Sequence, residues 1–376
     1  MIKILVAFIA MLILLASCVS TNHKSNFSAV VPVPATPTDP ISGILAAFEN
    51  NSIVALGEGG HGNEQSHALR MSLIRDPRFA ATVNDIVVEF GAAQNQSMLD
   101  RFLNGEDVSD SDLKKVWQDT TQTFPVWDVP IYEEFFRAVR AVNMSLPKDK
   151  KLRILLGDPA VDWDNDPKRS FDRDGHAAEL IKREVLDKKR RALVIYGDFH
   201  FFRRQPTMVD IKDGKEWPKN TNPSLVARVE QQNKIKIYTI RAYTEGGDLT
   251  LFQPEAKSWP APSFIKLKET ILGAQPFSFF LPGPVLAMSP DGVEHDLKVL
   301  PEFTMEEQFD ALLYFGPFSS ITFSKPTASL CRDSEFIKMR KHRTNLAGDP
   351  PEMAQRIEEI IKTSCEEVLK KNTTKK

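Results

Sequence analysis

Short apolar runs alternate along the chain with amphipathic segments, and this pattern predicts an α/β fold. Apolar runs of strand length occupy residues 53–56, 85–90, 152–156, 192–196, 235–240 and 309–315. Helical spacing of apolar positions occurs in residues 40–50, 63–74, 94–103, 130–142, 175–186 and 352–369. Most of the predicted strands are continuously apolar, which is typical of strands buried on both faces. The sequence therefore predicts a mostly parallel central sheet flanked by helices.

Four of the predicted strands end in glycine and an ionisable side chain. The motifs are Gly57-Glu-Gly-Gly-His61, Glu89-Phe-Gly91, Gly157-Asp158 and Gly197-Asp-Phe-His200. In a parallel sheet these ends lie on one edge, the carboxyl edge where ligands bind. Because buried carboxylates are costly unless paired, such a cluster indicates a site with a chemical task.

Each of these side chains also has a purely structural interpretation. Glu58 could cap the next helix, and Asp158 and Asp198 could be structural hydrogen-bond acceptors. Function is favoured for the two histidines and for Glu89, because each lies where a strand ends. Arg70, on the helix that leaves the first turn, could orient a carboxylate, stabilise an oxyanion or be an ordinary exposed arginine.

Residues 105–130 interrupt the alternation of strands and helices. This stretch is polar and carries three aromatic residues, Trp117, Phe124 and Trp127. We interpret it as an insertion over the site, with Trp127 as a candidate binding residue. The aromatic side chains could contact an apolar or ring-bearing ligand, or they could close the core.

Residues 1–17 have the features of a lipoprotein signal peptide. Lys3 precedes the apolar residues 4–15, and Leu15-Ala-Ser-Cys18 resembles the bacterial lipobox. The apolar run is too short to span a bilayer. We predict lipidation at Cys18 and a flexible tether over residues 18–40, on the periplasmic or surface face of a bacterial membrane. An ordinary signal peptide with a chance cysteine is the alternative.

Composition is ordinary for a globular enzyme, with 42% hydrophobic and 26% charged residues. We assign residues 41–345 to an α/β catalytic domain and residues 346–376 to a C-terminal helix packed on it. A net charge of −2 gives no reason to expect a nucleic-acid partner. Cys331 and Cys365 could form a disulfide in an exported protein or remain reduced and buried, since sequence does not give their distance.

The strand-end motifs resemble those of the erythromycin esterase family. Gly57-Glu-Gly-Gly-His61, followed by Glu64, Arg70 and Glu89, is similar to its Gly-Glu-x-x-His turn, its later arginine and its strand-end glutamate. Residues 135–143, 155–158 and 310–317 resemble further segments of that family. Gly197-Asp-Phe-His200 is similar to a Gly-x-x-His motif in the wider superfamily of haem-uptake lipoproteins and Tiki-type metallopeptidases.

This resemblance implies hydrolysis of a small carboxylic ester or lactone without a required cofactor. His61 would be the general base, held by Glu58 or Glu89, while Arg70 and His200 would stabilise the oxyanion. Asp158, Asp198 and Trp127 would contribute to binding. The chain between the second strand and Gly197 is shorter than in the antibiotic esterases, which argues against a macrolide-sized cleft.

Two other functions are compatible with the same residues. A lipid-anchored surface protein could bind haem, with His61 or His200 as the iron ligand. A metal-dependent hydrolase or peptidase could use His61, His200, Glu58 and Glu89 to hold a divalent metal. The chain lacks the His-Glu-x-x-His helix of zincins and the Gly-x-Ser-x-Gly elbow of serine esterases.

Overall fold

The computed structural model describes residues 31–165, 171–217, 222–281, 283–288, 294–347 and 351–373. The chain divides into two units, Met1–Val31 and Pro32–Lys376, and the helices and strands belong to the second. The predicted signal peptide, Cys18 and the first part of the predicted tether lie outside the described residues. None of the described helices combines the length and the apolarity that crossing a bilayer requires.

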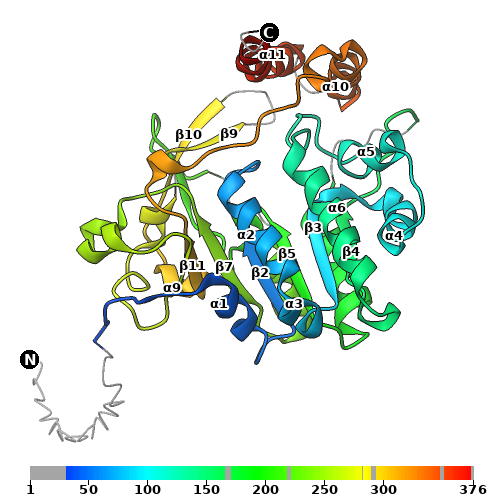
Figure 1. Cartoon of the computed structure of the whole chain (residues 1–376). Coiled ribbons are helices and arrows are strands. Elements are labelled where there is room, and N and C mark those ends of the chain that lie inside the picture. Colours follow the sequence, from blue (N-terminus) through cyan, green and yellow to red (C-terminus); the bar gives the residue numbers. More distant parts are fainter. Residues whose placement is uncertain are drawn as a thin grey trace, which may run out of the picture. The chain divides into compact units, whose positions relative to one another are not determined.

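The main sheet has eight strands in the order β1-β8-β11-β7-β2-β5-β3-β4. From β11 to β4 neighbouring strands are parallel (Figure 1). Strand β8 runs antiparallel to β11, and β1 runs antiparallel to β8. The strands are β1 (Pro37–Thr38), β2 (Ile53–Gly57), β3 (Asp85–Ala92), β4 (Arg153–Asp158), β5 (Ala192–Tyr196), β7 (Tyr238–Tyr243), β8 (Ser263–Lys266) and β11 (Ala311–Tyr314). The predicted mostly parallel α/β sheet is therefore confirmed.

The strands are continuously apolar because both faces of the sheet are covered. In β2, Val54 and Leu56 face one hydrophobic core, and Ile53 and Ala55 face the other. The first core is covered by α1 (Pro40–Ala47), α2 (Glu64–Arg75), α3 (Pro77–Thr82), α4 (Gln96–Asn104), α5 (Asp110–Gln118) and α6 (Pro130–Ser145). The second is covered by α7 (Arg173–Ile181), which continues as a π-helical turn over Lys182–Leu186, and by α8 (Leu225–Asn233).

A small antiparallel sheet, β6-β10-β9, was not predicted. It contains β6 (Met208–Asp210), β10 (Glu294–Val299) and β9 (Val285–Met288), and the short helix α9 (Met305–Gln308) follows it along the chain. Val299 and Met305 contribute to the second core. The strands are short and β10 is largely polar, so local sequence gives little sign of them.

The insertion over residues 105–130 contains α5, and its tryptophans close the core. Trp117 stacks on Phe136 with ring centroids 6.1 Å apart, and Trp127 packs against Phe90 and Tyr132. Both tryptophans are buried. Trp117 and Trp127 therefore close the core, which is the structural one of the two roles considered for these aromatic side chains.

The C-terminal part of the chain forms a helical hairpin rather than a single helix. The hairpin consists of α10 (Ser334–Ala347) and α11 (Pro351–Thr373), and Phe336, Ile357 and Ile361 form a small core between the helices. A disulfide joins Cys331 to Cys365, whose Cα atoms lie 5.5 Å apart. The prediction of one helix after residue 345 missed α10, and the domain boundary itself stays a prediction.

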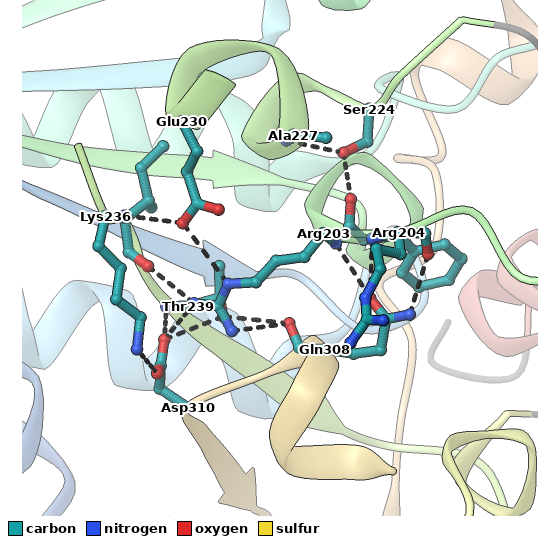
Figure 2. Close-up of polar contacts among 11 residues, drawn as sticks. Arg203, Arg204, Ser224, Ala227, Glu230, Lys236, Thr239, Gln308 and Asp310 are labelled. Carbon is teal, nitrogen blue, oxygen red and sulfur yellow. Dashed lines mark hydrogen bonds and ion pairs between the residues drawn. The ribbon is translucent and has the colours of Figure 1, made fainter. Parts of the chain in front are cut away.

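A polar network at the amino ends of β7 and β11 anchors the segment that follows His200 (Figure 2). The Arg203 guanidinium donates to the Asp310 carboxylate at 2.5 Å and to the carbonyl oxygen of Ile237 at 2.9 Å. The same carboxylate accepts a hydrogen bond from the Thr239 backbone at 2.9 Å. Burial opposes ionisation, but the Arg203 charge and the hydrogen bonds keep the pKa of Asp310 below its ordinary value.

Replacing Arg203 with methionine should lower the free energy of unfolding by about 3 kcal/mol, because Asp310 would lose its largely buried cationic partner. Chemical denaturation followed by circular dichroism measures this change. Lys236→Met is the matched control, since Lys236 binds the same carboxylate from an exposed position and its loss should cost less than about 1 kcal/mol. Equal losses in the two variants would contradict the proposed anchoring role of Arg203.

Candidate functional site

The carboxyl ends of β2, β5 and β3 lie side by side, because β5 is inserted between the other two strands. Gly57 at the end of β2 pairs with Tyr196 at the end of β5, and Ile195 pairs with Val88 of β3. Glu58 and His61 follow β2, Glu89 lies in β3, and Asp198 and His200 lie in a short 3-10 helix, Asp198–Phe201, after β5. The structure thus brings these strand-end residues together at one edge.

Glu58 is buried and holds two basic side chains. One carboxylate oxygen accepts from Arg70 Nη1, and the other lies 2.9 Å from His61 Nδ1. Burial raises the pKa of Glu58, but the Arg70 charge and the His61 hydrogen bond outweigh it, so the net shift is downward. An anionic Glu58 requires a proton on His61 Nδ1, which leaves Nε2 of a neutral imidazole free to act as a base.

The His61 imidazole is the accessible part of this cluster, with 36% of its side chain exposed. Its ring packs edge-on against Trp127, with centroids 4.5 Å apart. Burial lowers the pKa of His61, but Glu58 and Glu89 raise it above the ordinary value overall. A Cβ atom at Gly197 would lie only 3.2 Å from Cε1 of the ring, so glycine there lets the imidazole sit against the backbone.

Glu89 is buried at the centre of the edge. Its Oε2 accepts from the Gly197 backbone N–H at 2.8 Å, and its Oε1 lies 2.9 Å from Arg173 Nη2 and 3.2 Å from His200 Nε2. The β3–β4 register shifts between Val88 and Ala92, so Glu89 lies where the regular ladder is interrupted. Burial would raise its pKa, but His200 and Arg173 lower it well below the ordinary value.

His200 is held on both sides by carboxylates. Its Nδ1 lies 2.5 Å from an Asp174 oxygen, and its Nε2 bonds to Glu89. Burial disfavours its charge, but Glu89 and Asp174 raise the pKa of His200 to about 10. His200 is therefore a cation at neutral pH with both N–H groups engaged.

Asp158 binds protein groups rather than facing a ligand. Its carboxylate accepts from Arg173 Nε at 2.8 Å and from the backbone and hydroxyl of Thr121 at 2.5 and 2.9 Å. Burial raises its pKa above the ordinary value in spite of the Arg173 charge. Because Thr121 belongs to the insertion, Asp158 fixes the insertion to the carboxyl edge.

Asp198 lies behind the turn that follows β2, where it pairs with the buried Arg241 of β7 at 3.2 Å. Burial raises the pKa of Asp198 to about 6. Its Oδ1 has no hydrogen-bond partner among the described residues, and it would clash with any Cβ atom at Gly57. Gly57 therefore has to be glycine while Asp198 occupies this position.

Three charged residues of the site were not predicted as part of it. Arg173 and Asp174 begin α7, whose N-cap is Asp172. Arg241 lies inside the buried strand β7. An arginine inside an apolar strand is a usable signal for a buried carboxylate partner. Arg173 and Asp174 lie in a run of charged residues that looks like solvated surface.

The donor set fits a divalent metal poorly. Glu58, His61 and Glu89 can place one ligand atom each within 4.8 Å of one another. However, both carboxylates already bind guanidinium groups, those of Arg70 and Arg173. A divalent cation would lie beside two positive charges and would have to displace existing hydrogen bonds. His200 is also poorly placed to be a ligand of haem iron, because both of its ring nitrogens are engaged.

No protein-family model and no curated protein matches the chain. Among solved structures, it is similar to a Bacillus cereus protein with 12% identity over 77% of this chain and 96% of that one, at a TM-score of 0.48. It is also similar to a succinoglycan biosynthesis protein (11% identity, 75% of this chain, 94% of that one, TM-score 0.44). A haem-bound ChaN of Campylobacter jejuni has 14% identity over 55% of this chain and 86% of that one, at a TM-score of 0.30. Similarities of this size carry no information about activity.

The charge on His200 should make stability depend on pH. A pKa raised from 6.5 to about 10 means that the stabilisation is fully present below pH 6.5 and is lost as pH rises towards 10. The free energy of unfolding should therefore fall across this interval, and it should fall less steeply in His200→Gln. Denaturation curves at several pH values measure both slopes. Identical slopes for the two proteins would show that His200 is not a cation in the folded state.

Proposed function

We propose that this chain is a hydrolase that cleaves carboxylic esters or lactones with a water molecule activated by His61. The observation that carries this proposal is the bond between His61 Nδ1 and the buried, Arg70-paired Glu58. It fixes the tautomer in which Nε2 is free, on the accessible part of the site. An imidazole held in this way by a carboxylate is a suitable general base at neutral pH.

In this mechanism Nε2 of His61 takes a proton from water while the water oxygen attacks the carbonyl carbon of the ester. The carbonyl oxygen becomes the oxyanion of a tetrahedral intermediate. The proton on Nε2 then passes to the leaving alkoxide as its bond to carbon breaks, which releases acid and alcohol. Glu58 stabilises the imidazolium that exists between these two steps.

The oxyanion role suggested for Arg70 and His200 does not suit their positions. Arg70 is buried behind Glu58, and His200 has both N–H groups engaged. We assign both as positioning residues, with Arg70 fixing Glu58 and His200 fixing Glu89. Arg173 has more exposed surface than Arg70, so it is the better candidate to face a developing negative charge.

The cellular context proposed with this activity comes from the sequence alone. The lipobox-like residues before Cys18 support export and a lipid anchor on a bacterial membrane. The proposed partners are that membrane and a small ester-like substrate, with no nucleic acid.

Replacing His61 with alanine or glutamine should reduce ester cleavage by roughly 10²–10⁴-fold, the usual contribution of a general base. The assay is a panel of chromogenic esters and lactones, with circular dichroism as the check on folding. His295→Gln is the matched control, because His295 also pairs with a carboxylate, Asp210 at 2.6 Å, but on the small sheet. Full activity in a folded His61→Ala would remove the proposed mechanism.

Glu58→Gln should shift the pH dependence of kcat/KM towards acid. The active base is neutral His61, and the Glu58 charge raises its pKa, so wild-type activity should rise with pH through a value above 6.5. Without that charge the rise should begin at lower pH, while the plateau rate falls because the imidazolium loses its counter-ion. An unchanged midpoint would mean that a group other than His61 controls the rate.

Metal-dependent hydrolysis is the second candidate, and the closeness of Glu58, His61 and Glu89 is the observation that favours it. Because two guanidinium groups compete for the same carboxylates, we expect hydrolysis to survive dialysis against a chelator. Metal analysis of the purified protein should show less than one equivalent. Loss of activity on chelation, restored by one specific divalent ion, would favour this second candidate instead.

A further inference from the structure

The segment that follows β11 returns across the turn that carries His61. Phe323 forms a bridge with Asn63, and the backbone N–H of Ser324 donates to the Gly62 carbonyl at 2.8 Å. The Phe323 ring lies over Gly60, where an added Cβ would come within 2.8 Å of it, yet 46% of this residue is exposed. An exposed aromatic ring beside a catalytic turn is suited to contact a ligand.

Next to this segment lies a cavity of about 220 Å³. Its lining comes from the end of the insertion, from residues 323–326, from Leu330, from Phe336 of α10 and from α11. Its apolar lining includes Pro125, Val129, Phe323, Leu330, Ile360 and Ile361. Ile360 is 37% exposed on α11, so part of this apolar surface is open to solvent.

The charged residues of the lining are already paired. Asp128 is buried and binds Arg340 at 2.5 Å, and Lys325 lies 3.4 Å from Glu367. A charged ligand group would therefore find no unpaired opposite charge among these lining residues. The lining favours an uncharged, apolar group.

The cavity adjoins the proposed base. A Cβ atom at Gly62, the residue after His61, would lie 3.9 Å from Val129 and 4.0 Å from the carbonyl oxygen of Ser324, and both residues line the cavity. Trp127 packs against the His61 ring two residues before Val129. One wall of the cavity is thus continuous with the packing that holds the imidazole.

The far wall is held in place covalently. Cys365 of α11 lines the cavity, and its disulfide to Cys331 joins α11 to the segment before α10. Because the hairpin core consists of few buried side chains, the disulfide limits how far α11 can move away. The cavity wall therefore stays formed without a ligand.

We propose that this cavity binds the apolar acyl group of the ester substrate. The inference rests on the proposed hydrolase function and adds the substrate class, an uncharged ester with an aliphatic or single-ring acyl group. A volume of about 220 Å³ is below the range of whole-ligand pockets, so the cavity accommodates one arm of a substrate and not a macrolide.

Two measurements on the full chain test the proposal. The first is binding of octanol, a neutral aliphatic probe, measured by isothermal titration calorimetry. The second is the ratio of kcat/KM for an octanoyl ester to kcat/KM for an acetyl ester. Ile360→Glu and Phe323→Ser should each weaken probe binding and lower the ratio by about tenfold, because burial of apolar area is lost. Met144→Glu is the control, since Met144 is 59% exposed on α6 and does not line the cavity.

The outcomes separate this inference from the hydrolase proposal. Loss of probe binding in both cavity variants but not in Met144→Glu supports the cavity assignment. Unchanged probe binding and an unchanged ester ratio in Ile360→Glu and Phe323→Ser overturn it, even if wild type cleaves esters. If neither the wild type nor any variant cleaves an ester, the hydrolase proposal and the acyl assignment are both wrong. Probe binding then shows only whether the cavity binds apolar groups.

Discussion

A carboxylate buried at the end of a strand has to be neutralised, and the Glu58–Arg70 pair meets this requirement at the end of β2. Both side chains are buried, so removal of either one would leave an uncompensated charge that costs several kcal/mol. Gly59 and Gly62 have positive φ angles of 70° and 83°, which let the chain reverse directly into α2. This reversal is what brings Arg70 back to Glu58. The orientation of the His61 ring depends on this Glu58–Arg70 pair, since Glu58 holds its Nδ1.

The same requirement recurs at the end of β3, and it is met from the other face of the sheet. Arg70 comes from α2, which covers the first core, whereas Arg173 comes from α7, which covers the second. Arg173 bridges Glu89 and Asp158, so a single guanidinium neutralises acids on two neighbouring strands. The helices on both faces are therefore held to the carboxyl edge by charge as well as by apolar packing. A change in charge at Glu58 would therefore act on α2, and a change at Glu89 or Asp158 would act on α7.

The predictable part of this molecule is the part in which local sequence determines position. Continuous apolar runs predicted the parallel strands, and the residues after them predicted which side chains meet at the edge. Arg173 could not be predicted in the same way, because it reaches Glu89 over 84 positions and nothing near it in the sequence indicates the partner. The small sheet was missed because its strands are short and β10 is largely polar. The bond between Cys331 and Cys365 likewise depends on how α11 folds back.

Trp127 and Asp128 connect the edge of the sheet to the C-terminal hairpin. Trp127 packs against the His61 ring, and the next residue binds Arg340 of α10 in a pair that is almost completely buried. Because the two residues are consecutive, a displacement of α10 would be transmitted to the imidazole through a rigid peptide unit. The hairpin therefore belongs to the architecture of the site, although it lies more than a hundred residues after His200.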